Sequence, residues 1–352
     1  MKECLPKVFQ VVIIVLNMNE NFENIAISSR IRLARNISGF NFFTKLRETS
    51  DAVFIINSLQ KILDKFGGFD FIRLKKLSLN ECNALLERHL ISKELIENKD
   101  ISAVAISDDE HFVVMINEED HIREQCLVSG FNLYKPYREI KQLDDLILSE
   151  IDVAYSKDYG YITSSPSNLG TGMRASVMLF LPALERNKDI ELIKKEARQQ
   201  GFTLRGLYGE GSKNFGSFYQ ISNQNSLGLS EGEIIDGVSE YVYDICQMEL
   251  SAREDILASN HDELVDEIYR AFGTLKECYV LEEKEMIELL SLVRFGDALG
   301  FLKISDHKSF KRLSVEGSSA NLKEIENSFG NLKEERARSE YINRKIKELV
   351  SK

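Results

Sequence analysis

Small polar residues and glycines fill residues 161–176, which read YITSSPSNLGTGMRAS and contain few apolar side chains. A loop of this length inside a compact domain usually carries function. Its hydroxyl groups and accessible backbone N–H groups can donate hydrogen bonds, and Arg174 adds a positive charge near its end. The stretch is therefore a candidate cradle for a polyanion, although a long surface turn would have the same composition.

The segment Ser28-Ser29-Arg30-Ile31-Arg32 has the alternation of a β-strand. Successive strand side chains point to opposite faces, so Ile31 would face the core while Arg30 and Arg32 share the other face, roughly 6–7 Å apart. Two guanidinium groups at that separation can bind neighbouring phosphates. The alternative is a pair of solvated arginines on a half-exposed strand.

A third cluster, NEEDHIR at residues 117–123, directly follows the apolar run at 112–116. Adjacent carboxylates at the end of a strand repel one another, a cost that is tolerated more readily where a cation or guanidinium binds. Arg123 supplies a further phosphate ligand, and an acidic helix N-terminus is the alternative interpretation. His121 by itself does not indicate a metal site, since no second histidine stands at ligand spacing.

A fourth cluster, RGLYGEGS at residues 205–212, places glycines around one arginine and one glutamate. A mobile loop of this kind can close over bound ligands and bring a cation and a carboxylate, Arg205 and Glu210, to them. The tip of a β-hairpin would have the same composition.

The composition limits the class of protein. With 352 residues, the chain is long enough for about two domains. A formal net charge of −11 and a pI of about 5.2 argue against binding of nucleic acid. The five cysteines are scattered without metal-ligand spacing, which favours a reducing cytoplasm. The apolar run at 8–16 is too short to span a membrane, and residues 1–20 are interpreted as a leader of uncertain status, with Met18 as an alternative start.

Apolar periodicity predicts the elements that hold these clusters. Strands are expected at 25–33, 101–106, 112–116 and 125–128, with a hairpin turn at Asp108-Asp109-Glu110. Helices are expected at 53–66, 137–151, 173–184 and 189–200, and Ser230 with Glu233 forms a capping box for a helix at 231–250. Irregularly interspersed strands and helices favour an α+β fold with a largely antiparallel sheet flanked by helices.

Beyond residue 255 the strand pattern fades and helical spacing dominates. Apolar residues then recur on single helical faces, as in Met286, Leu289, Leu290 and Val293, and again in Ile342, Ile346 and Leu349. The chain is therefore predicted to have a larger domain at 21–254 and a small all-helical domain at 255–352. The helical domain would serve self-association, or it would simply cover the first domain.

The four clusters together resemble the phosphagen, or ATP:guanidino, kinase family. The motifs SSRIR, NEEDHIR, SPSNLGTGMRAS and the later glycine loop stand in the family's order and at compatible spacings over about residues 24–250. Within the family, RGLYGEGS, FYQISNQNSLGLSEGEII, IYRAFGTLKE and LLSLVRFGDALGFL are similar to the bacterial protein arginine kinases of the McsB type. Only 29 residues precede Arg30, which is fewer than the N-terminal helical domain of the small-guanidine kinases needs.

The resemblance implies transfer of the ATP γ-phosphoryl group to the guanidinium of arginine residues in proteins, with Mg²⁺ as the partner ion. It implies Glu119 as the carboxylate that orients the target guanidinium, Glu210 as a second carboxylate, and Ser165 at the position where the family usually has cysteine. The residues implied to bind the nucleotide are Ser28, Ser29, Arg30, Ile31, Arg32, His89, Arg123, Arg174, Ala175, Ser176, Val177, Met178, Arg205, Gly206, Leu207, Tyr208, Gly209 and Glu210.

Two departures from the family pattern affect the expected activity. Serine at 165 lacks the charge of a cysteine thiolate, so slower turnover is expected. The Arg-Asp-x-x-Arg-Ala motif that binds phosphoarginine in the McsB subgroup corresponds here to residues 334–339, which read EERARS. Because the first cation has become an anion, control by phosphoarginine is not expected even though Arg338 remains.

The resemblance also implies partners and leaves two alternatives. It implies a cytoplasmic homodimer that acts in the stress response and in protein quality control, on protein substrates with exposed arginines. An activator protein, a stress-gene repressor and a Clp unfoldase are the further partners, without direct nucleic-acid or membrane binding. The alternatives are a kinase of free arginine and a catalytically weak adaptor that binds the repressor or the unfoldase.

Overall fold

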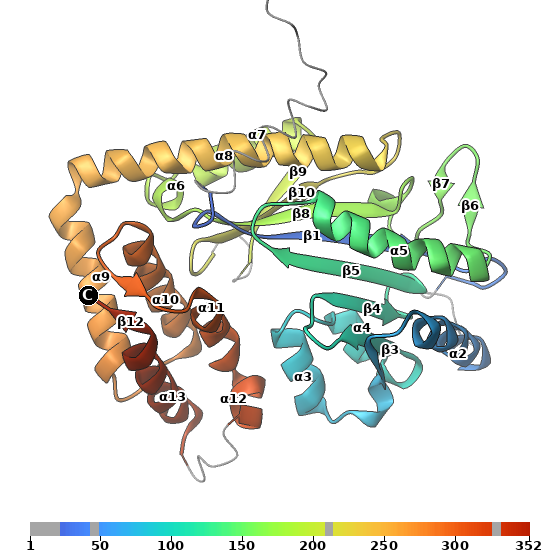
Figure 1. Cartoon of the computed structure of the whole chain (residues 1–352), viewed down its shortest axis with the longest axis horizontal. Helices are drawn as coiled ribbons and strands as arrows, with labels where there is room; N and C mark the ends of the chain where they lie inside the picture. Colours follow the sequence, from blue (N-terminus) through green and yellow to red (C-terminus); the bar gives the residue numbers. More distant parts are fainter. Residues whose placement is uncertain (1–21, 43–48, 208–213, 326–331) are drawn as a thin grey trace, which may run out of the picture.

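An eight-stranded sheet forms the centre of the molecule (Figure 1). The computed structural model describes residues 22–42, 49–207, 214–325 and 332–352. The strand order is β2-β3-β4-β5-β1-β8-β10-β9, and every pairing is antiparallel. The strands are β1 Ala26–Arg35, β2 Phe69–Arg73, β3 Ala103–Ser107, β4 Phe112–Ile116, β5 Ile122–Ser129, β8 Met173–Phe180, β9 Phe202–Gly206 and β10 Phe218–Asn223. The predicted α+β class with an antiparallel sheet is confirmed.

Long helices cover the apolar face of this sheet. Helix α5 packs on β1 and β5, and α8 packs on β8 and β10, so that alternate strand residues such as Ile31 and Val177 are fully buried. The Ser230–Glu233 capping box begins α8 as predicted. The helices of this layer are α2 Thr49–Phe66, α5 Tyr134–Glu150, α6 Pro182–Arg186, α7 Ile190–Gln199 and α8 Glu231–Ser259.

Short helices cover only part of the opposite face. They enclose a second apolar cluster against β3 and β4, in which Leu85 and Leu95 meet Val104 and Val113. These helices are η2 Leu74–Lys76, α3 Leu79–Glu87, α4 Lys93–Glu97 and η3 Lys99–Ile101. The same face of β1, β5, β8 and β10 is not covered by them, and it carries the predicted arginines.

The C-terminal part is helical and lies beside the sheet, opposite α3 (Figure 1). It consists of α9 His261–Glu277, α10 Glu283–Ala298, α11 His307–Glu316, α12 Ser319–Ile325 and α13 Glu334–Leu349, with a small ribbon of β11 Lys303–Ile304 and β12 Val350–Ser351. One continuous apolar core joins these helices to α8 and the sheet. Helix α8 runs past residue 254 to Ser259, so the predicted domain boundary falls inside a helix.

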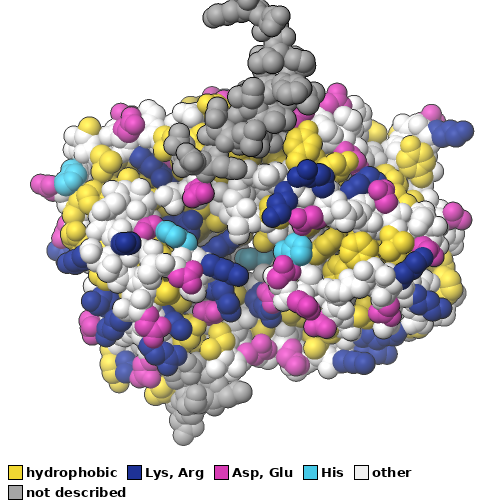
Figure 2. All heavy atoms as spheres, in the orientation of Figure 1, with side chains coloured by type: hydrophobic (Ala, Val, Ile, Leu, Met, Phe, Trp, Pro, Cys, Tyr) yellow, Lys and Arg dark blue, Asp and Glu magenta, His cyan; other side chains and the backbone are white. Residues whose placement is uncertain are grey.

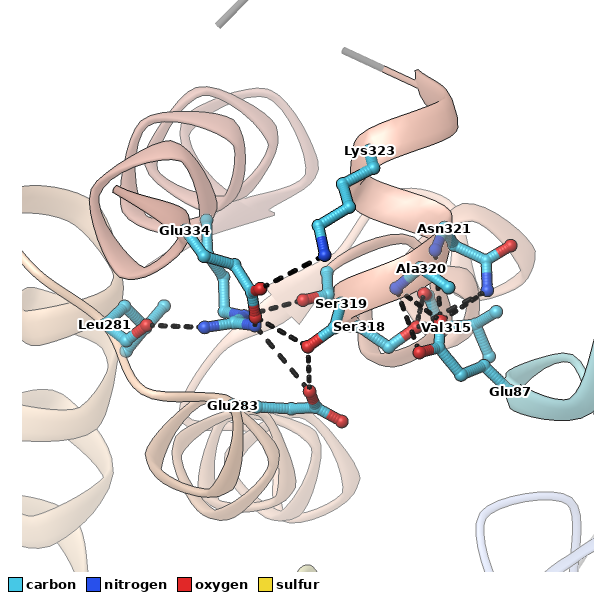
Figure 3. Close-up of polar contacts among 12 residues, drawn as sticks. Glu87, Leu281, Glu283, Val315, Ser318, Ser319, Ala320, Asn321, Lys323 and Glu334 are labelled. Atoms are coloured by element: carbon cyan, nitrogen blue, oxygen red, sulfur yellow. Dashed lines mark hydrogen bonds and ion pairs between the residues drawn. The ribbon is translucent and has the colours of Figure 1, made fainter. Parts of the chain in front are cut away.

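The contact between α3 and α12 is polar and specific (Figure 3). Glu87, at the end of α3, accepts hydrogen bonds from the backbone N–H groups of Ala320 and Asn321 at 2.9–3.0 Å. The Ser318 hydroxyl donates to the same carboxylate at 2.5 Å, and the Asn321 amide donates at 2.9 Å. A carboxylate placed on the first N–H groups of a helix satisfies donors that otherwise have no partner. Glu87 therefore fastens the helical region to the part that carries the arginines.

One element prediction is wrong. Residues 173–184 were expected to form a helix, whereas Met173–Phe180 is β8, an interior strand of the sheet, and only Pro182–Arg186 is helical. Met173, Ala175, Val177 and Leu179 are fully buried in the core at alternate positions, which is the period of a strand. The apolar run was dense enough to match helical spacing as well, and pairing with β1 and β10 decides between the two. The other predicted strands and helices are confirmed with ends shifted by a few residues, except that α8 continues nine residues past its predicted end at residue 250.

None of the helices in the described parts of the chain is long and apolar enough to cross a membrane.

Candidate active site

Four strands carry the predicted arginines, and their pairing brings these side chains to one face of the sheet. Directly opposite residues of antiparallel strands point to the same side. On β1 and β8, Arg32 lies opposite Arg174, and Arg30 lies opposite Ser176. Arg123 on β5 shares this face through its pairing with Ala34. Arg205 on β9 joins it through β10, where it lies opposite Gln220. These arginines thus form one positively charged surface, the arginine face, from segments that lie far apart in sequence.

Within the described parts of the chain, these arginines lack enough negative partners. The Arg32 and Arg174 side chains each hold a buried Nε atom that donates to no described residue. Burial, then Arg123 and Arg174, lowers the pKa of Arg30 to about 10, and burial and neighbouring arginines lower the pKa of Arg32 well below its usual value. Arg174 is shifted downward as well: its pKa is lowered by burial and by Arg205. Mutually repelling buried cations predict that a polyanion belongs here.

Three carboxylates follow β4 in a turn, and each has a different role. Glu118 is almost fully buried and binds Arg123 Nη1 with both oxygens, at 2.6 and 2.7 Å. Burial would raise the pKa of Glu118, but Arg123 outweighs it and the pKa is lowered. Asp120 accepts hydrogen bonds at 2.6 Å from the Asn36 side chain and from the Ser164 N–H. The expected acidic cluster is therefore a hairpin turn between β4 and β5, not a helix N-terminus.

Glu119 is the carboxylate of the three that stays available. It accepts no hydrogen bond and forms no ion pair within the residues that the structure describes. Burial raises its pKa, and the charges of Asp120 and Glu118 raise it further. A half-buried carboxylate with a raised pKa is suited to bind a cation and to accept a proton.

The polar loop between β7 (Gly160–Tyr161) and β8, residues 162–172, is called the serine loop and lies beside Glu119. A small cavity of about 100 Å³ is lined by Glu119, Ser165 and Gly172 together with Arg32, Arg123 and Arg174. The Ser165 hydroxyl lies 3.0 Å from that of Ser167. Gly172 has φ +69°, and a Cβ atom there would lie 2.6 Å from the Ala34 carbonyl oxygen, so the loop can approach β1 this closely only with glycine. The cavity is thus bounded by cations, one free carboxylate and hydroxyl groups.

A second, larger cavity of about 540 Å³ continues from this surface toward the helical region. Arg30, Ser28, Ser176 and Met178 line it from the sheet, and His89 lines it from the loop after α3. His89 has φ +59°, and burial and Arg30 lower its pKa, which favours a neutral ring. Figure 2 shows a hollow at the middle of the molecule, with Lys, Arg and His side chains and some acidic ones around it.

Not every predicted residue reaches this surface. Ser29, Ile31, Ala175 and Val177 lie at the intervening strand positions, and their side chains are buried on the other side of the sheet. Their side chains therefore do not contribute to this face, and their assignment to the nucleotide site stays a prediction. Of the glycine loop, Arg205, Gly206 and Leu207 are described and Leu207 lines the larger cavity, whereas Tyr208, Gly209 and Glu210 lie outside the described residues.

Several contributors were missed by sequence reasoning. Gln125 accepts a hydrogen bond from Arg30 at 3.3 Å, and Ser222 accepts one from Arg174 at 2.9 Å. Arg35 forms a fully buried ion pair with Asp144 at 2.9 Å and donates to the Thr171 carbonyl, which anchors the serine loop. Strand alternation would have placed Gln125 and Ser222 on the arginine face once the pairing was known. Nothing local indicates the Arg35–Asp144 pair.

Potential metal ligands meet at one place in the described parts of the chain, where His111, Cys126 and Glu139 have ligand atoms within 4.8 Å of one another. The Cys126 thiol donates to Glu139 at 3.4 Å, and burial together with Glu139 raises its pKa. A metal requires the thiolate, which these neighbours disfavour. His121 is also engaged, since its Nδ1 accepts the Ile37 N–H at 3.0 Å and its Nε2 lies 2.9 Å from the Asn41 carbonyl. We therefore assign structural roles to the His111–Cys126–Glu139 group and to His121.

The stretch at 334–339 forms a closed network of its own (Figure 3). Arg338 is 2% exposed and donates to Glu334 at 2.6 Å, to the Gly317 carbonyl at 2.6 Å and to the Leu281 carbonyl at 3.1 Å. Glu334 also accepts a hydrogen bond from Ser319 at 2.5 Å. All three guanidinium nitrogens of Arg338 thus donate hydrogen bonds to groups within the protein.

Comparison with known proteins agrees with the geometry. The ATP:guanido phosphotransferase C-terminal catalytic domain matches residues 53–252, and the protein-arginine kinase McsB C-terminal domain matches residues 261–352. The chain is 40% identical over 331 residues to the protein-arginine kinase of Clostridium tetani, covering 93% of this chain and 96% of that protein. It is 42% identical over 325 residues to that of Clostridium acetobutylicum, covering 91% and 95%.

Solved structures show the same fold at lower identity. A lombricine kinase superposes with a TM-score of 0.58 and 24% identity, covering 66% of this chain and 68% of that one. The duplicated taurocyamine kinase from Schistosoma mansoni gives a TM-score of 0.60 and 24% identity, covering 73% of this chain and 38% of that longer one. With both matched regions and relatives of about 40% identity, the chain belongs to the ATP:guanido phosphotransferase family and, within it, to the protein-arginine kinases.

Proposed function

We propose that the arginine face binds the phosphates of ATP while Glu119 holds the guanidinium of a target arginine in a protein. One observation carries this assignment: among the described residues Glu119 is a carboxylate without a partner, and it lines a small cavity together with arginines that these residues do not fully neutralise. Membership of the family makes the chain a phosphotransferase with a guanidino acceptor. The roles of the individual residues are our proposal.

The geometry suits phosphoryl transfer, because cationic side chains and one carboxylate line the same small cavity. Phosphoryl transfer depends on positioning and on neutralising charge, which Arg32, Arg123 and Arg174 would do at the cavity wall. A guanidinium becomes a nucleophile as it loses a proton, and a carboxylate with a raised pKa, such as Glu119, can orient its nitrogen and accept that proton. ATP would supply the phosphoryl group, and Mg²⁺ bound with it would add further neutralising charge.

The direct test is phosphorylation of an unfolded, arginine-rich protein with ATP and Mg²⁺, with acid-labile phosphoarginine identified by mass spectrometry. We expect phosphoarginine on the protein and little product from free arginine. Product from free arginine alone would identify the small-guanidine alternative. Nucleotide binding without any phosphoarginine would support the adaptor alternative.

Replacing Ser165 with cysteine should raise kcat roughly five- to tenfold. Ser165 lines the small cavity beside Glu119, Arg123 and Arg174, where a thiol would lose its proton readily. A thiolate accepts a charge-assisted hydrogen bond from a guanidinium, and such a bond is stronger than one to a neutral hydroxyl. Steady-state rates with one protein substrate provide the measurement, with Ser165→Ala as the matched variant. An unchanged rate in Ser165→Cys would disprove this account of the serine.

Free phosphoarginine should leave the kinase rate unchanged. The Arg338 donors are satisfied by Glu334 and by backbone carbonyls, and Glu283 lies 3.6 Å from the same guanidinium. A phosphate would have to displace Glu334 and approach two carboxylates, which repel it. Titration of phosphoarginine into a continuous assay of ADP release tests this, and activation or measurable binding at this cluster would contradict it.

The wider setting is proposed from the family resemblance. We propose action on exposed arginines of proteins in the cytoplasm, as a homodimer, in the stress response and protein quality control. An activator protein, a stress-gene repressor and a Clp unfoldase are the proposed partners. The division into a catalytic domain at 21–254 and a helical domain at 255–352 belongs to the same proposal.

A further inference from the structure

The larger cavity has two walls that come from different parts of the chain. Its volume of about 540 Å³ is in the range of sites for small organic ligands. The sheet contributes one wall, which includes Ile27, Arg30 and Met178. The second wall comes from α10 and α11 of the helical region. Its lining residues include Leu290, Arg294, Phe310 and Lys311. The helical region therefore encloses space beside the arginine face as well as packing against the sheet.

The charges of this cavity do not balance. Its two carboxylates are already engaged, since Glu110 pairs with Arg88 and Asp109 with His111. Arg312 is neutralised by Glu316 at 3.0 Å. Cations with no ion-pair partner in the described parts of the chain remain on both walls: Arg30 on the sheet, and Arg294, Lys308 and Lys311 on the helices. In a protein with a net charge of −11, this local excess of positive charge points to an anionic ligand.

Arg294 is the most constrained of the helical cations. Its guanidinium carbon lies 5.5 Å from the ring centre of Phe180 and 5.9 Å from that of Phe218, and its Nε is buried without a hydrogen-bond partner among the described residues. Asp297, on the same helix, is occupied by the Ile304 N–H at 2.7 Å. Burial lowers the pKa of Arg294 to about 10. A cation that packs on aromatic rings and has a buried donor without an acceptor costs free energy of folding unless a ligand accepts that hydrogen bond.

Lys311 strengthens the same wall from the next helix. It belongs to α11 and lines the cavity near Arg294. Lys311 is an exposed residue of this wall; partial desolvation lowers its pKa, and the charge of Arg294 lowers it further. Two neighbouring cations that disfavour each other are stabilised together by one anion or by an electron-rich polar group.

We propose that α10 and α11 complete the nucleotide site, with Arg294 and Lys311 binding ATP from the side opposite Arg30. This inference rests on the proposed function, because it takes the arginine face as the phosphate site. Arg32 lines the small cavity and Arg30, two residues away on β1, lines the large one. A nucleotide whose terminal phosphates lie at Arg32 would extend past Arg30 into the large cavity. The apolar side chains of Ile27, Met178 and Leu290 suit its base.

The test is the affinity of the full chain for ADP, measured by titration calorimetry with Mg²⁺. Arg294→Met and Lys311→Met should each raise the Kd for ADP about tenfold, since each removes a charged contact to the ligand. Lys303→Met is the matched control. Lys303 is an exposed lysine of the same helical region that does not line the cavity, so its replacement should leave the Kd unchanged. Melting temperatures of all variants show whether each is folded.

The outcomes separate this inference from the proposed function. If wild type binds ADP and both variants bind it equally well, the helical wall has no part in the site, whatever the kinase activity. If both variants lose affinity but wild type makes no phosphoarginine, the nucleotide site stands and the proposed reaction fails. If Arg294→Met does not fold, the test uses Arg294→Lys and Lys311→Met instead. An unchanged affinity for ADP in both of these variants would overturn the proposal. Arg294→Lys keeps the charge and loses the planar fork, so a smaller loss is expected.

Discussion

Replacing Glu119 with glutamine should lower kcat for arginine phosphorylation by roughly 10²–10⁴-fold, the usual contribution of a positioned general base. Glutamine keeps the size and a hydrogen-bonding oxygen but cannot accept the proton or attract the target guanidinium. Glu119 has no ion-pair partner in the described residues, so the change should leave the fold intact. The affinity for ADP should hardly change, since the nucleotide contacts are assigned to arginines.

Single-turnover phosphorylation of a protein substrate, read as phosphoarginine, measures this effect. Glu94→Gln is the matched control, because Glu94 is an exposed carboxylate close enough to contribute to the raised pKa of Glu119 but does not line the small cavity. It removes the same charge from the same neighbourhood and should leave kcat nearly unchanged. Equal losses in both variants would show that only the local potential matters, and a fully active Glu119→Gln would end the assignment.

The same carboxylate predicts a pH dependence with a definite sign. Burial, Asp120 and Glu118 raise the pKa of Glu119 above its usual range. The active form is the ionised carboxylate, so kcat/KM should be full above this raised pKa and should fall as the pH drops through it. The acid limb should therefore lie above the ordinary glutamate value of about 4.3. Glu119→Gln should lack that limb in its residual activity.

Alternation along strands was the part of this site that could be predicted locally. The spacing of Arg30 and Arg32 placed both on one face before any pairing was known, and the structure agrees. The role of each residue in NEEDHIR could not be predicted, because three adjacent carboxylates look equivalent until their partners are known. Arg123 pairs with Glu118, and the Ser164 N–H donates a hydrogen bond to Asp120. Glu119 therefore remains available for a ligand.

Long-range pairing explains what local patterns missed. Residues 173–184 fitted a helix because their apolar positions satisfy both periods, and only pairing with β1 makes Met173–Phe180 a strand. That strand also puts Arg174 and Ser176 beside β1. Nothing near Arg294 in the sequence indicates that a helix of the C-terminal part faces a cavity of the sheet. Such contacts depend on how distant elements pack, which single-sequence periodicity does not contain.

Replacing Arg32 with methionine should have opposite effects on activity and stability. Activity should fall by roughly 10³–10⁵-fold, the range seen for an arginine that neutralises a transferring phosphoryl group. The free protein should become more stable by about 1 kcal/mol, because methionine fills similar volume without a buried charge. Arg32 lies among Arg30, Arg123 and Arg174, and burial and these charges lower its pKa, so the folded state holds its charged form at a cost.

The stabilisation should appear as a Tm raised by a few degrees without nucleotide. Adding ADP should raise the Tm of wild type more than that of Arg32→Met, because ligand binding to the folded state stabilises it in proportion to affinity. Arg270→Met is the control, since Arg270 is an exposed arginine of α9 that pairs with Asp266 one turn away, and both its Tm and its activity should match wild type. A lower Tm for Arg32→Met would mean that the arginine face is already neutralised in the free protein. A higher Tm with lost activity would show that the protein maintains this repulsion to bind a polyanion.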